Sequence, residues 1–220
     1  MNEELLKNYI DDFLKYYKEN PQKLHDHMEE RNYLINYYQN FTKDKILQMT
    51  EGELYEYLSK LWAMSTWGNK QYIIDKIIEE NGLRNFCKSL AALVWGDNNI
   101  IDRWNNFHTE TKRVGPAMKS EILCKTHPNK YMLWNRRVFV GLNCLEVENL
   151  PIPGYGYQLT GKVYSYLCNI SKNIADELKE AGFEDTTLLA VDYFIRYGLQ
   201  IKGSLLQYIQ KEKKTNKRKT

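Results

Sequence analysis

Residues 111–140 read TKRVGPAMKSEILCKTHPNKYMLWNRRVFV, and no other part of the 220-residue chain holds as many informative positions. A turn followed by a helix is predicted at its start, because Gly115 tolerates a strained backbone and Pro116 suits the first helical position. The helix should end near His127, since the residue before Pro128 leaves the helical region. Its apolar residues are expected to share one face: Met118, Ile122 and Leu123.

Several cations surround this turn, namely Lys112, Arg113 and Lys119. The free N–H groups of a helix N-terminus after Gly115, with these side chains beside them, would make a seat for a phosphate group. The sequence therefore predicts a contact with a nucleic-acid backbone at this turn. An ordinary connection between two helices with a solvated basic rim is the alternative.

Three pieces of this stretch resemble the hairpin of the helix-hairpin-helix DNA glycosylases. These are the turn Val114-Gly115, the helical residues 120–123 and the later segment 134–139. The family pattern is a hydrophobic-Gly-hydrophobic-Gly turn, a helix with a small residue before branched ones, and a later Asp-containing segment ending in Val or Ile and an aromatic. The resemblance implies an all-α, multi-helix globule that handles DNA bases.

The departures from the family pattern bear on chemistry. Arg113 stands where the first hairpin glycine is expected, and Ala117 where the Schiff-base lysine of the bifunctional members would lie. The position of the family's catalytic aspartate falls on Asn135, and an amide cannot carry the negative charge of a carboxylate. The resemblance thus implies a base pocket without catalysis, lined by Trp134, Asn135, Arg136 and Arg137.

A second resemblance rests on P-x-K-Y at 128–131, a hydrophobic-Asn-x-x-Val pattern at 134–138 and G-F-E-D-x-x-x-L-x-x-D-Y-F at 182–194. These patterns are similar to the helical domains that precede the motor of McrB-type, modification-dependent restriction proteins. Such domains bind DNA carrying a modified base, while an AAA+ motor and a nuclease subunit act with them. The chain has no G-x-x-x-x-G-K-[ST] loop, so the resemblance implies that any motor lies outside it.

Composition and charge fit a compact DNA-binding protein. No apolar run is long enough to cross a membrane and no signal peptide is recognisable, so a cytoplasmic location is expected. The four cysteines and four histidines match no metal-ligand spacing, so no metal or cofactor is predicted, and the histidines are expected to be surface or capping groups. The net charge is only +3, yet residues 103–137 hold eight Lys or Arg against two Asp or Glu.

Hydrophobic periodicity predicts helices throughout, with hardly any alternating strand pattern, so the fold class is all-α. A capping box is expected where Glu53 follows Thr50 by three residues. The helices are expected at about 3–18, 21–38, 51–64, 70–80, 83–94, 100–110, 116–127, 158–181, 186–197 and from 204, and residues 140–149 are expected to form a helix and then a loop. One domain should span 1–205, with sub-lobes 1–64 plus 158–205 and 65–157, before a basic tail or linker at 206–220.

Residues 150–157, LPIPGYGY, combine proline and glycine in a way that excludes regular structure. The loop would present Tyr155 and Tyr157 to an extruded base, whose π-face stacks on aromatic rings. In the alternative, both tyrosines pack on the fold.

Three functions remain open from the sequence. The leading hypothesis is a non-catalytic module that binds double-stranded DNA and recognises a modified base, with base flipping as one route, in a restriction system. The second is a glycosylase acting on a damaged base, in which Glu121 or Asp102 replaces the missing aspartate. The third is a helical protein-interaction domain, with Arg136 and Arg137 pairing with carboxylates of a partner.

Overall fold

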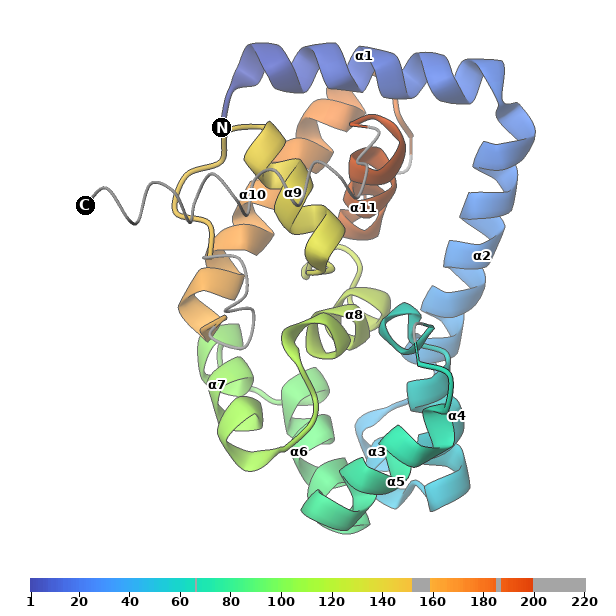
Figure 1. Cartoon of the computed structure of the whole chain (residues 1–220), viewed down its shortest axis with the longest axis vertical. Helices are drawn as coiled ribbons and strands as arrows, with labels where there is room; N and C mark the ends of the chain where they lie inside the picture. The colour runs from blue at the N-terminus through green and yellow to red at the C-terminus, as the bar shows by residue number, and fades with distance from the viewer. Residues whose placement is uncertain (66, 152–158, 185–186, 200–220) are drawn as a thin grey trace.

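The structure, a computed structural model, describes residues 1–65, 67–151, 159–184 and 187–199 (Figure 1). Within these ranges the regular structure is entirely helical, which confirms the all-α prediction. The elements are α1 (Glu3–Glu19), α2 (Pro21–Gln39), α3 (Lys43–Gln48), α4 (Glu51–Ser59), the 3₁₀ helix η1 (Trp62–Met64), α5 (Lys70–Asn81), α6 (Leu83–Trp95), α7 (Ile100–Glu110), α8 (Pro116–Thr126), α9 (Arg136–Cys144), α10 (Gly161–Glu180) and α11 (Leu188–Tyr197).

The helices surround a central one, α8. Figure 1 shows α1 across the top, with α9, α10 and α11 beneath it, while α2 descends along one side to α3, α4 and α5. The central helix packs against α2, α6, α11 and η1. One continuous cluster of buried apolar side chains includes residues from every one of the eleven α-helices.

Local signals place most helix ends where the sequence predicts them. The capping box is present, because the Thr50 side chain accepts from the backbone N–H of Glu53 while the Glu53 carboxylate accepts from the N–H of Thr50. Gly82 and Gly182 follow helices at φ +73° and +93°, a region that favours glycine. Pro21 begins α2 directly after Asn20 ends α1.

A helix and then a loop cover 140–149 as predicted, but the helix begins before Val140. It runs from Arg136 to Cys144, because the side chain of Asn135 accepts from the N–H of Val138 and starts the helix there. Helix α9 lies against α11, and its C-terminal end meets the start of α1. The last helix from Ser204 and the tail at 206–220 lie outside the described residues.

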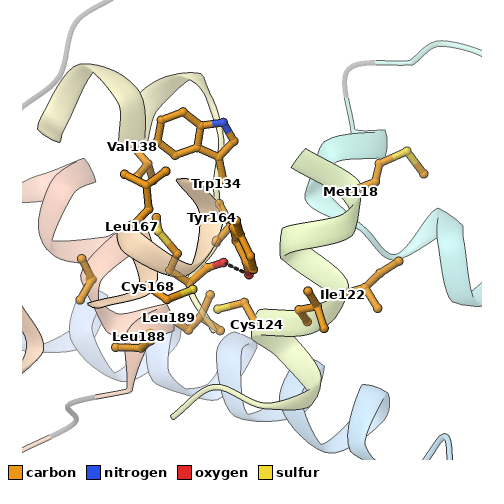
Figure 2. Packing of buried hydrophobic residues seen from close by; sticks show 14 of the residues in the cluster. Met118, Ile122, Cys124, Trp134, Val138, Tyr164, Leu167, Cys168, Leu188 and Leu189 are labelled. Atoms are coloured by element: carbon orange, nitrogen blue, oxygen red, sulfur yellow. Dashed lines mark hydrogen bonds between the residues drawn. The ribbon is translucent and has the colours of Figure 1, made fainter. Parts of the chain in front are cut away.

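The central helix differs from the one-sided helix predicted for it. Every residue of α8 from 118 to 126 is buried, because neighbouring helices enclose it on all sides. In Figure 2, Cys124 points toward Tyr164 and Cys168, whereas Met118 and Ile122 point away on the other side of the helix. Three charged residues of α8 are consequently buried: Lys119, Glu121 and Lys125.

Glu121 and Lys125 form a buried ion pair that ties α8 to η1. The Glu121 carboxylate accepts from the backbone N–H groups of Trp62 at 2.5 Å and Ala63 at 2.9 Å, and from Lys125 Nζ at 2.5 Å. Lys125 also donates to the carbonyl of Lys60, and its ammonium lies 4.2 Å from the Trp62 ring. The carboxylate thereby supplies the cap that η1 lacks in its own sequence.

No helix in the described parts of the chain is long and apolar enough to cross a membrane. The same parts contain no group of three or more His, Cys, Asp or Glu side chains placed to hold a metal ion.

Candidate nucleic-acid interface

The loop between α7 and α8 is fastened to the end of α5. Asn81 Oδ1 accepts from the backbone N–H of Lys112 at 2.7 Å, and Asn81 Nδ2 donates to the carbonyl of Lys112 at 3.2 Å. The Thr111 hydroxyl donates to the carbonyl of Phe107, in the last turn of α7. These bonds tie the loop between α7 and α8 to the ends of α5 and α7.

The sequence suggested a strained backbone at Gly115, but the strained residue of this loop is Arg113. Arg113 has φ +66°, in the left-handed region, whereas Gly115 has an ordinary φ of −78° and open space beside it. A non-glycine residue in this region costs about 1 kcal/mol. The chain accepts that strain where Asn81 holds the preceding residue.

The start of α8 has no capping side chain. Gly115 occupies the cap position and Pro116 the first helical position, so the N–H groups of Ala117 and Met118 lack a side-chain acceptor. By contrast, Asn99 caps α7 and Asn135 caps α9. The partial positive charge at the start of α8 is therefore not neutralised by a cap.

Two of the three predicted backbone-binding cations are exposed. Lys112 points away from the core, and Arg113 forms an ion pair with Glu80 in which both side chains remain partly exposed. Lys119 is only 1% exposed and its ammonium lies 4.2 Å from the Trp104 ring, so its predicted contact with a phosphate is wrong. Burial lowers the pKa of Lys119 to about 8.

Trp134 lies in the core and cannot offer its face to a base from the surface. It is 6% exposed and packs edge-on against Phe139. Its backbone N–H donates to Ser120 Oγ at 2.8 Å, and its carbonyl accepts from the same hydroxyl. These contacts join the segment before α9 to α8.

Asn135 and Arg137 meet at a carboxylate that the sequence reasoning missed. Asn135 Nδ2 donates to Asp192 Oδ1 at 3.3 Å, and Arg137 lies 3.7 Å from Asp192 Oδ2. Arg136, in the first turn of α9, is exposed. One sequence feature could have identified Asp192: it is a single carboxylate within the apolar run LLAVDYFI of α11. Such a run is expected to be buried, so its carboxylate is expected near the core.

Tyr155 and Tyr157 lie outside the described residues. The sequence offered Glu121 and Asp102 as replacements for the catalytic aspartate. Both instead stabilise the start of a helix, because Glu121 caps η1 and Asp102 accepts from Asn99 at the start of α7.

The helix that carries Asp192 is anchored by His27, which is not the surface or capping group predicted from the sequence. Its Nδ1 lies 2.9 Å from the Tyr17 hydroxyl and its Nε2 lies 2.9 Å from the Tyr197 hydroxyl. The ring also stacks on Tyr193 and Tyr197. Through His27, helices α1, α2 and α11 are joined.

Acid should weaken this junction. Burial, and then Arg196, lower the pKa of His27, although Glu30 and Asp26 oppose the shift. A histidine with a lowered pKa in the folded state stabilises the fold fully above the unfolded value near 6.5, and that contribution is lost as the pH falls below it. We expect the free energy of unfolding, measured with urea, to decrease from pH 7.5 to pH 5.5.

His27→Gln isolates this contribution, since burial also lowers the pKa values of His108 and His127. The variant should be less stable than the wild type at pH 7.5 but should lose less stability on acidification. An identical loss in both proteins would assign the pH dependence to the other histidines.

Comparison of the chain with protein-family models, with curated proteins and with solved structures finds no match. The resemblance to the helix-hairpin-helix glycosylases therefore stays a prediction from the sequence.

Proposed function

We propose that the chain is a DNA-binding module whose hairpin between α7 and α8 holds phosphate groups of the DNA backbone. One observation carries the proposal: exposed Lys112 and Arg113 directly precede the uncapped start of α8, in a loop that Asn81 holds in place. Backbone N–H groups and a helix dipole favour an anion there, and two cations add charge attraction. Arg and Lys side chains, backbone N–H groups and helix N-termini are the groups that commonly contact the phosphates of a DNA backbone.

The conformation of Arg113 supports the alignment with the glycosylase hairpin. The family carries its first hairpin glycine at this position, and Arg113 adopts the left-handed backbone that glycine adopts most readily. The left-handed backbone conformation thus occurs at the position where the family pattern has a glycine, although this chain has an arginine there.

The finer part of the proposal is recognition of a modified base, as the specificity module of a modification-dependent restriction system. Asn135 Oδ1 accepts from Val138, and one N–H of its Nδ2 donates to Asp192. Within the described parts of the chain, the second N–H of Nδ2 is free to donate to a base edge, and Asn135 would read the base with it. Because Asp192 can accept only from the amide nitrogen, it fixes the orientation of the amide. An AAA+ motor domain or a nuclease subunit would act together with this module.

We expect Arg113→Gln to weaken binding to a 20-base-pair duplex about three- to tenfold at low salt, and to reduce the salt slope by about one. Glu80→Gln should strengthen binding about twofold, because it releases Arg113 from its ion pair. Fluorescence anisotropy at two salt concentrations measures both effects. Glu19→Gln, on α1 at the other end of the molecule (Figure 1), makes the same charge change and should alter binding little.

Matched duplexes, unmodified or carrying 5-methylcytosine, 5-hydroxymethylcytosine or N6-methyladenine, test the finer part. A preference for one modification with intact strands supports a reader of that base. If Arg113→Gln and Glu80→Gln bind the duplex as the wild type does, the loop between α7 and α8 does not contact DNA. If the protein binds no duplex at low salt, the protein-interaction domain is favoured.

A DNA glycosylase is the second candidate, and Asp192 is the observation that favours it. Its carboxylate lies next to Asn135, the position where the family carries its aspartate, so another helix supplies a carboxylate there. Alkali-labile strand breaks in the same reactions, absent in Asp192→Asn, would support catalysis.

A further inference from the structure

Two arginines, Arg137 of α9 and Arg196 of α11, lie near Asp192 where the first turn of α9 meets α11. Arg136 and Arg137 open α9, and Arg196 lies one helical turn after Asp192 on α11. Asp192 is 6% exposed, whereas Arg136 and Arg196 are exposed and the Arg137 side chain is 37% exposed. Charged groups of both signs meet here, but the cations face water.

One buried carboxylate leaves much of this positive charge uncompensated. The 3.7 Å separation between Arg137 and Asp192 is longer than a hydrogen bond, so the guanidinium keeps N–H groups for another acceptor. The described residues offer Arg196 no ion-pair partner, and its guanidinium lies 5.0 Å from the Tyr197 ring. Asp192 therefore holds one arginine loosely and neutralises at most one positive charge.

Both guanidinium groups act on the same two side chains. Burial raises the pKa of Asp192, and Arg137 and Arg196 each oppose that rise. Burial likewise raises the pKa of Tyr197, and again Arg196 and Arg137 work against it. Two other carboxylates are nearby, and both already have partners: Glu30 accepts from the Trp62 indole at 3.1 Å, and Glu121 pairs with Lys125.

We propose that Arg137 and Arg196, gathered around Asp192 at the junction of α9 and α11, form an oxyanion site that takes a phosphate group. Two guanidinium groups present planar sets of N–H donors, a geometry that suits the several oxygens of a phosphate. The phosphate comes either from a DNA backbone or from a free phosphorylated molecule.

The test compares the wild type with Arg137→Gln/Arg196→Gln and with the matched control Lys88→Gln/Lys172→Gln, which removes two exposed charges on α6 and α10. Inorganic pyrophosphate, titrated by calorimetry, and the 20-base-pair duplex are the probes. The double arginine variant should bind pyrophosphate about tenfold more weakly, while the control stays near the wild type. Thermal melting checks the fold, and Arg196→Gln alone serves if the double variant melts early.

Each outcome decides between the sources. A weaker affinity for the duplex, with a salt slope reduced by about two, assigns the site to the DNA backbone. Lost pyrophosphate binding with unchanged duplex binding assigns it to a free phosphorylated molecule. If the arginine variants bind both probes as the wild type does, or if the wild type binds neither, there is no site. Failure of Arg113→Gln to affect the duplex concerns the hairpin and leaves this site standing.

Discussion

Replacing Glu121 with alanine should lower the free energy of unfolding by about 3–5 kcal/mol, the usual cost of breaking a buried ion pair from one side. Lys125 would remain fully buried with its charge unpaired. Burial already lowers the pKa of Lys125, and Glu121 is the largest influence that opposes this. The backbone N–H groups of Trp62 and Ala63 would also lose their acceptor. Urea unfolding followed by circular dichroism measures the loss.

The double variant Glu121→Leu/Lys125→Met separates the two contributions. It removes both charges together, so the penalty of an unpaired buried ammonium disappears. Only the uncapped N–H groups of η1 remain, and each buried unsatisfied group costs about 1–3 kcal/mol. The double variant should therefore be more stable than Glu121→Ala. If Glu121→Ala unfolds within experimental error of the wild type, the buried pair does not hold η1 in solution.

Gly161→Ala should destabilise the protein by about 3 kcal/mol, at the upper end for an overpacked site. A Cβ atom at Gly161 would lie 2.3 Å from the carbonyl oxygen of Ile101 and 2.7 Å from its Cα. Backbone atoms cannot rotate away as a flexible side chain can, so α10 must move from α7. That movement would disturb the stack of Trp104 on Tyr164, whose ring centroids are 4.0 Å apart.

The melting temperature reports this loss, and about 6–12 °C is expected for a chain of this length. Gly52→Ala is the matched control, because a Cβ there meets nothing within 4 Å and Gly52 lies in helix α4. That variant should keep or slightly raise the melting temperature, since alanine favours the helix over glycine. Equal melting of the two variants would mean that α7 and α10 do not approach closely at Gly161.

Structural features that depend on a few neighbouring residues could be predicted from the sequence. The capping box at Thr50 and the glycine after α5 are local signals, and both are found where they were expected. The exposure of Lys112 and Arg113 in the loop between α7 and α8 was also predicted.

Burial that depends on distant helices could not be predicted. Lysine is normally solvated, so Lys119 suggests a surface, and only the enclosure of α8 by α2, α6, α11 and η1 places it inside. The contact of Asn135 with Asp192 joins residues 57 apart in sequence, and no local pattern records it. The exposed residues of the loop between α7 and α8 could therefore be predicted from the sequence, whereas the contacts between α9 and α11 could not.

The position of α1 across α10 and α11 matters for the order in which the chain is made. The backbone N–H of Asn2 donates to the carbonyl of Leu145, and the buried face of α1 packs against α11 near the other end of the described chain. At about 5–20 residues per second, synthesis of α11 follows that of α1 by roughly 10–40 s. During this interval the apolar face of α1 has no α11 to cover it. The exposure of α1 to chaperones and proteases is thus set by the speed of translation.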